Sequence, residues 1–162
     1  MRLSDQWEIL NAARKSIPVP VHSLPASLGI KLKTAFLASG ISGMLEKKDD
    51  SFLITINVAD PDTRQRFTLA HELGHYMLHR HLIGDGLDDD RAYRSTEAGK
   101  YHNTLIGPEE ETEANRFAAN LLMPREAINR ERLKLSDNVT AMASLFGVSE
   151  HAMSIRMGIK YR

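Results

Sequence analysis

The segment His71-Glu72-Leu73-Gly74-His75 lies in the middle of a stretch that we expect to form one helix, from Pro61 to about His79. Residues four apart on a helix differ by about 40° in direction and by ~6 Å along the axis, so the two imidazoles can converge on one tetrahedral metal ion. Glu72 points about 100° away from the pair but still reaches a water molecule beside the metal, where a general base is needed. Gly74 leaves room beside the metal.

The expected helix is apolar almost all round, which predicts that it is buried at the centre of the fold. Two histidines and a glutamate without partners would be costly there, and a metal ion removes that cost. The sequence contains no cysteine. Any metal must therefore be held by histidines and carboxylates, and disulfides and thiol catalysis are excluded.

Composition indicates one globular domain over residues 1–162, because 42% of the residues are hydrophobic and 26% are charged. Twenty-one basic residues balance twenty-one acidic ones, which argues against a large nucleic-acid surface or a polybasic membrane anchor. The longest apolar runs are too short to span a membrane, and Asp5 and Glu8 interrupt the region where a signal peptide would be apolar. We therefore expect a cytoplasmic protein.

The order of expected elements predicts an α+β fold with a small antiparallel or mixed sheet, a central metal-binding helix and further packing helices. We expect an N-terminal helix over 1–16, a short helix over 21–29, strands within 30–37, 44–47 and 51–57, and helices over 108–123 and 124–134. Two short helices should follow around Gly147. Residues 80–108 show no periodicity, and we expect 84–106 to be the least ordered part and to gate the site.

A third protein ligand is needed to complete a metal site with one open position. His79 cannot serve, because it lies ~12 Å from His71 along the helix axis. The helix over 108–123 offers four glutamates; on the helical wheel Glu113 borders the apolar stripe, Glu110 lies within it, and Glu109 and Glu111 are expected to face solvent. Acids in a first turn also simply complement the helix dipole. The wheel alone does not choose between Glu110 and Glu113.

Two stretches of the sequence resemble the ImmA/IrrE family of metallopeptidases. They are Arg66-Phe-Thr-Leu-Ala-His-Glu-Leu-Gly-His-Tyr-Met-Leu-His79 and Glu113-Ala-Asn-Arg-Phe-Ala-Ala-Asn-Leu-Leu-Met-Pro124, and the segments 41–43 and 54–57 are also similar to the family's sheet. The resemblance covers residues 17–160 and implies a zincin-like fold with Zn²⁺. It implies that His71 and His75 are ligands, Glu72 the catalytic base and Glu113 the third ligand.

Some features of the expected site depart from related enzymes or stay open. Two histidines and a glutamate also suit Mn²⁺. Thermolysin-like enzymes place an aspartate four residues after the ligand glutamate, where it orients a histidine, whereas Phe117 stands at that position after Glu113. The partners that orient the ligands must therefore come from elsewhere, with Glu110 and His102 as candidates.

The resemblance implies a zinc-dependent endopeptidase, because similar family members cleave helix-turn-helix transcriptional repressors encoded nearby. We expect the strand 51–57 to have a free edge beside the site and to pair with an extended substrate, with Ser51, Ile54, Ile56 and Asn57 as contact residues. Residues 85–113 carry nine acids and three bases. This acidic segment is expected to meet a basic DNA-binding partner.

Two other functions compete with this interpretation. One is a metal-binding interaction protein, similar to a toxin–antitoxin partner, with little hydrolysis. The other is a DNA-binding regulator that uses residues 138–158, whose spacing resembles a helix-turn-helix. Its second helix would present Ser149, Glu150 and His151, with few bases nearby. Such a helix is a poor phosphate binder, so we do not expect direct nucleic-acid binding.

Overall fold

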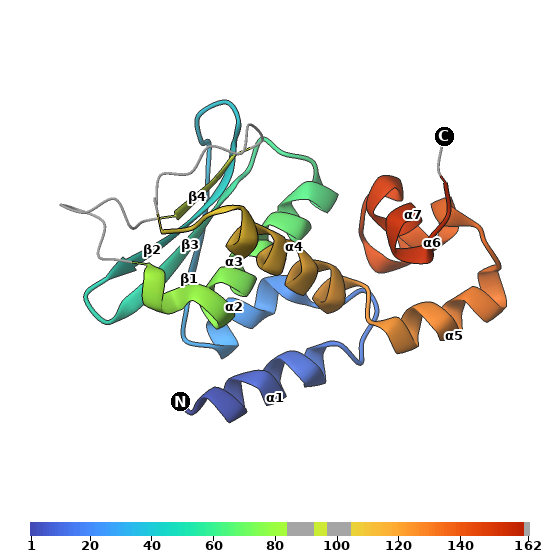
Figure 1. Cartoon of the computed structure of the whole chain (residues 1–162), viewed down its shortest axis with the longest axis horizontal. Helices are drawn as coiled ribbons and strands as arrows, with labels where there is room; N and C mark the ends of the chain where they lie inside the picture. The colour runs from blue at the N-terminus through green and yellow to red at the C-terminus, as the bar shows by residue number, and fades with distance from the viewer. Residues whose placement is uncertain (84–92, 97–104, 161–162) are drawn as a thin grey trace.

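A computed structural model describes residues 1–83, 93–96 and 105–160 of the chain. Its helices and strands follow the expected order (Figure 1). They are α1 (Leu3–Ala13), the 3₁₀ turn η1 (Val21–Ser23), α2 (Leu24–Ser27), β1 (Lys31–Ala35), β2 (Ile41–Lys48), β3 (Ser51–Asn57), α3 (Asp62–His79), the 3₁₀ turn η2 (Arg80–Leu82), β4 (Tyr93–Thr96), α4 (Pro108–Leu122), α5 (Arg125–Leu135), α6 (Val139–Phe146) and α7 (Glu150–Met157).

The four strands form one mixed sheet in the order β1-β3-β2-β4. β2 and β3 form the predicted antiparallel hairpin, β1 pairs with β3 in parallel, and β4 pairs with β2 in antiparallel. The predicted α+β class is confirmed. β3 is an interior strand, however, because it has a neighbour on each side. The expectation of a free edge along 51–57 is therefore wrong.

Helix α3 lies between the sheet and α4, and two glycines allow both approaches. A Cβ on Gly43 of β2 would stand 2.5 Å from the Thr68 Cγ2 atom, and one on Gly74 would stand 3.0 Å from Phe117 Cδ1 and 3.2 Å from the Ala114 Cα. Gly74 thus makes room for α4, not for a metal as the sequence had suggested. α3 is buried along most of its length from Thr68 onward, which confirms the prediction of a central helix.

Helices α5, α6 and α7 lie on the side of the molecule away from the sheet (Figure 1). The two short helices predicted around Gly147 are confirmed as α6 and α7, which begin at capping side chains of Asn138 and Ser149. Gly147 adopts the left-handed conformation, with φ of 68°, that lets α6 end there. Buried side chains of these helices, such as Phe146, join the same hydrophobic core as those of α3.

The segment expected to be a poorly ordered gate, residues 84–106, falls mostly outside the described residues, and so does His102. Its described part includes β4, which was not predicted. Among the described helices, none is both long and apolar enough to cross a membrane.

Candidate metal centre

Three side chains from α3 and α4 converge at the centre of the molecule: His71, His75 and Glu111. The Nε2 atoms of the two histidines are 3.1 Å apart, and the Glu111 Oε1 atom lies 3.3 Å from the first and 3.0 Å from the second. A tetrahedral zinc ion with bonds of about 2.0–2.1 Å separates its ligand atoms by about 3.3 Å. The three atoms therefore already stand close to the corners that such an ion requires.

The carboxylate in this cluster is Glu111, not Glu113. The Glu113 side chain is 49% exposed and its Oε1 atom lies 3.3 Å from His79 Nε2, whereas the Glu111 side chain is 15% exposed. Glu110 is also elsewhere, since its carboxylate accepts a hydrogen bond from the Gly107 N–H at 3.3 Å and caps the start of α4.

Helical rotation explains this correction. At about 100° per residue, Glu111 and Glu113 point about 200° apart, and Glu111 lies on the same side as Ala118 and Leu122, seven and eleven residues later. Both of those residues are buried. The placement of Glu111 toward solvent on the helical wheel was wrong, and an accurate wheel would have kept it as a candidate.

Each histidine of the cluster is held through its second ring nitrogen. His71 Nδ1 lies 2.7 Å from the Asn115 Oδ1 atom, to which it can donate, and His75 Nδ1 lies 2.9 Å from His79 Nδ1. These contacts orient both rings so that their Nε2 atoms face Glu111. Asn115 stands four residues after Glu111, the spacing at which thermolysin-like enzymes place the aspartate that orients a histidine. Counted from Glu113, the same spacing leads to Phe117 instead.

Glu72 is fully buried, and both of its carboxylate oxygens lack a hydrogen-bond partner in the described part of the chain. Burial, reinforced by the nearby charge of Glu111, raises the pKa of Glu72 well above its usual range. A buried carboxyl without a partner is costly, and the free energy of a cation or substrate beside it would offset that cost. The donor set and this unpartnered group together fit a metal ion.

The protonation states of the cluster suit metal binding at neutral pH. Burial lowers the pKa of His75 to about 4, although the hydrogen bond with Glu111 acts in the opposite direction. Burial would raise the pKa of Glu111, but hydrogen bonds from His71 and His75 outweigh it and lower the pKa to about 2. At pH 7 the cluster thus presents a neutral imidazole and an ionised carboxylate, which are the forms that bind metals.

A groove of about 800 Å³ opens beside the cluster, and we call it the metal groove. Its walls come from one face each of α3, α4 and α7, and it includes His71, Glu111 and His151. The sequence had suggested His151 only as a residue that a DNA-binding helix would present, although the spacing of Val148, Ala152 and Ile155 indicates an apolar face along this part of the chain.

The residues expected to contact substrate lie away from this groove. Ile54 and Ile56 are buried in the core, and Ser51 is exposed at the start of β3. The Asn57 side-chain amide donates to the Ile41 carbonyl at 2.9 Å, and its oxygen accepts from the Ala59 N–H at 3.0 Å. None of the four is among the residues that line the metal groove.

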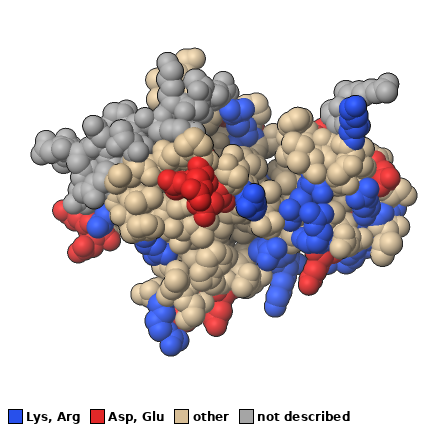
Figure 2. Space-filling model, in the orientation of Figure 1, with Lys and Arg blue, Asp and Glu red and all other residues tan. Residues whose placement is uncertain are grey.

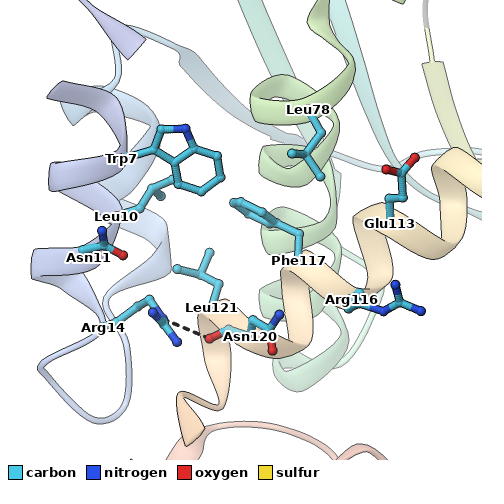
Figure 3. A pocket seen from close by; sticks show the side chains of 10 residues that line it. All are labelled: Trp7, Leu10, Asn11, Arg14, Leu78, Glu113, Arg116, Phe117, Asn120 and Leu121. Carbon is cyan, nitrogen blue, oxygen red and sulfur yellow. Dashed lines mark hydrogen bonds between the residues drawn. The ribbon is translucent and has the colours of Figure 1, made fainter. Parts of the chain in front are cut away.

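A second cavity, of about 430 Å³, lies on the opposite face of α4, between α1, α3 and α4 (Figure 3). The Trp7 and Phe117 rings meet there with centroids 5.9 Å apart, and Glu113 stands at its edge. Glu113 thus belongs to the surroundings of this cavity and reaches the metal cluster only through His79.

Comparison with known families matches residues 26–157 to the IrrE N-terminal-like domain, peptidase family M78. The chain belongs to this family. The match spans β1 through α7, so it contains every described residue of the cluster and of the metal groove, and it confirms the resemblance seen in the sequence. No curated protein matches the chain significantly. The family indicates a metallopeptidase, and the cluster of His71, His75 and Glu111 is a site that could hold its metal.

Proposed function

We propose that the protein is a zinc-dependent endopeptidase that cleaves a helix-turn-helix transcriptional repressor. The observation that carries the proposal is the convergence of His71, His75 and Glu111 around one point, next in the chain to the fully buried Glu72, whose carboxylate has no hydrogen-bond partner among the described residues. Two imidazoles and one carboxylate are a ligand set of catalytic zinc, which leaves the fourth position open. The same set also suits Mn²⁺.

In the proposed reaction, His71, His75 and Glu111 hold the metal, and a bound zinc ion supplies Lewis acidity to the peptide carbonyl and acidifies water. Glu72 takes the proton from the attacking water and delivers it to the leaving amine. Its raised pKa suits both steps, because the carboxyl must hold the proton between them. Asn115 and His79 keep the two imidazoles in place throughout.

The choice of a repressor as substrate rests on the family resemblance and on the shape of the site. A peptide must be extended to reach the carboxyl of a buried residue such as Glu72 through a groove between helices. A folded helical DNA-binding domain cannot do this, so the scissile bond should lie in an exposed loop or linker of the repressor. The acidic segment 85–113 would attract the basic surface of such a partner.

The placement of α7 weakens the DNA-binding alternative. The residues that a recognition helix would present, Ser149 and His151, line the metal groove together with His71. Lys and Arg side chains do gather over the C-terminal helices (Figure 2). Several of these arginines bind backbone carbonyls near helix ends, such as Arg156 on Met123 at 3.0 Å and Arg132 on Met157 at 3.0 Å. Helix capping thus accounts for much of this charge.

The test is incubation of the zinc-loaded protein with helix-turn-helix repressors encoded near its gene, followed by mass spectrometry of the fragments. We expect one cut in an exposed segment of one repressor. Glu72→Gln is the control: it should retain zinc and fold while cleavage falls by about 10²- to 10⁴-fold, the usual contribution of a general base. Undiminished cleavage by Glu72→Gln would refute the mechanism. Tight repressor binding by the zinc-loaded protein without any cleavage would favour the interaction protein.

A further inference from the structure

The metal groove extends well beyond the metal cluster. Its α4 wall consists of Glu111, Asn115, Ala119 and Met123, each four residues after the last and therefore on one face of the helix. Measured along the helix axis, Ala119 lies ~12 Å and Met123 ~18 Å from Glu111. An extended peptide advances about 3.3 Å per residue. The groove can therefore hold a segment that continues three to five residues beyond the reacting bond.

The two ends of the groove differ in chemistry. The end at the cluster is polar, with His71, Glu111 and Asn115. The far end is mostly apolar, and its apolar lining side chains come from α3, α4 and α7 or their flanks: Phe67, Met123, Val148, Ala152 and Ile155. The polar Ser149 and His151 also line the groove at α7. Met123 and Val148 are buried, whereas Ile155 is 67% exposed and stands at the rim. An exposed isoleucine above a buried apolar floor forms a site that a large apolar side chain can fill.

The far wall is tied to both helices that carry the metal cluster. Arg66 of α3 donates from Nε to the Gly147 carbonyl at 3.1 Å and from Nη2 to the Phe146 carbonyl at 3.4 Å, just before α7. Arg156 of α7 donates from Nε to the Met123 carbonyl at 3.0 Å, at the end of α4. These charged hydrogen bonds hold α7 at a set distance from the cluster. A subsite on α7 would therefore bind a substrate side chain at a fixed distance from the scissile bond.

We propose that the apolar far end of the metal groove, at Met123, Ala152 and Ile155, is a specificity subsite for one large apolar side chain, three to five residues from the scissile bond. This subsite proposal rests on the proposed endopeptidase function and adds to it the kind of substrate side chain that the groove selects. Its occupant is an extended segment of the protein substrate, because the same groove continues to His71 and Glu111.

The experiment uses a set of twelve-residue fluorescent peptides in a Gly/Ser/Ala background, with one Leu moved through each position. Binding is measured by fluorescence anisotropy on zinc-loaded Glu72→Gln, and cleavage is measured on the zinc-loaded wild type. We expect Leu at the inner positions to improve both binding and kcat/KM by about tenfold or more over the peptide without Leu, since filling an apolar pocket gives a preference of this size. Because the background is uniform, the cut should move with the Leu, and mass spectrometry of the fragments should place it three to five residues from the Leu in each peptide.

Two variants test the subsite itself. Ile155→Asp and Ala152→Leu, the second of which adds bulk to the subsite, should each abolish the preference for Leu over a peptide without Leu. Leu133→Asp is the matched control, because Leu133 is 88% exposed on α5 and does not line the groove. Circular dichroism checks that each variant folds. Equal binding and cleavage of peptides with and without Leu, a cut whose distance from the Leu varies between peptides, or the same Leu preference in Ile155→Asp and Leu133→Asp would overturn the proposal.

The two readouts separate this inference from the proposed function. If the peptides bind with the expected Leu preference and Ile155→Asp removes it, but the wild type cleaves none of them, the subsite stands and the endopeptidase proposal fails. If the wild type cleaves the peptides at the same rate with or without Leu, and at no fixed distance from it, the endopeptidase stands and the subsite fails.

Discussion

Opposite faces of helix α4 border two different cavities. The two cavities differ in whether the polar groups beside them have hydrogen-bond partners. On the face with Glu111, the metal groove is also lined by His71, and the next residue of α3, Glu72, has two buried carboxylate oxygens with no hydrogen-bond partner among the described residues. On the opposite face, the second cavity has the aromatic pair Trp7 and Phe117 (Figure 3), and a nearby guanidinium, that of Arg14, donates to the Asn120 carbonyl at 3.0 Å.

This difference shows that a cavity alone does not identify a functional site. Both cavities are large enough for a small ligand, but only the metal groove combines converging ligand atoms with a carboxyl whose burial is uncompensated. An unsatisfied buried polar group costs free energy, so a fold retains one where a bound group, such as a metal ion or a substrate, can interact with it. We interpret the second cavity as part of the packing interface between α1 and α4.

The largest expected effect separates the two glutamates that face these cavities. Glu111→Ala should lower zinc affinity by more than about 100-fold, because it removes one of three direct ligands, whereas loss of an outer contact costs about 10- to 100-fold. Glu113→Ala should stay near the lower end of that range, because Glu113 contacts His79, which in turn contacts His75. Titration with a competing chelator measures both. Loss of zinc from Glu113→Ala with full retention by Glu111→Ala would reverse the ligand assignment.

The contact that orients His71 should have the next largest effect on the metal groove. Asn115→Ala removes the 2.7 Å hydrogen bond to His71 Nδ1 and should lower zinc affinity by about 10- to 100-fold. Because Asn115 is exposed, the free energy of unfolding without metal should change little. Asn115→Asp restores an acceptor and should recover most of the affinity. Equal affinities of the Ala variant and the wild type would show that the His71 ring needs no partner.

The second cavity should behave in the opposite way. Trp7→Ala removes the ring that packs on Phe117 and should reduce the free energy of unfolding by roughly 2 kcal/mol, less than for a fully buried aromatic residue. Zinc affinity should be unchanged, because α1 contributes nothing to the cluster. Urea denaturation of the metal-free protein gives the first quantity and chelator competition the second. A large drop in zinc affinity would mean that the two cavities are coupled through Glu113 and His79.

The smallest expected effect is a pH dependence that belongs to Glu72. Its folded pKa is raised by burial, so its contribution to stability is fully present below the unfolded pKa of about 4.5 and is lost as the pH rises toward the folded value. Glu72→Gln does not titrate. The stability of the metal-free wild type relative to Glu72→Gln should therefore fall between pH 4.5 and pH 7.

Urea denaturation of both metal-free proteins at the two pH values measures this difference. Other titrating groups, such as His75, are present in both proteins and largely cancel in the comparison. A difference that is constant with pH would show that the Glu72 carboxyl is compensated in the fold by a partner. The conclusion that it marks the site would then lose its physical basis.

Much of the site was predictable from the sequence because it depends on local helical geometry. The spacing of His71 and His75 places two imidazoles on one face of any helix, and Glu72 follows at a fixed angle. The absence of cysteine restricts the remaining ligand to a carboxylate or another histidine. The α+β class and most helix boundaries also follow from local periodicity and from prolines and glycines, which act within a few residues.

Only the tertiary structure decided which distant residues meet. The pairing of α3 with α4 selects Glu111 among four neighbouring glutamates and brings Asn115 to His71, and it depends on a close approach that Gly74 allows. Pairing of β1 with β3 removes the free edge that the sequence suggested, and α7 becomes a wall of the metal groove because Arg66 and Arg156 hold it there. The periodicity of one element shows which face it buries, but the register and angle between two elements arise from the packing of both surfaces.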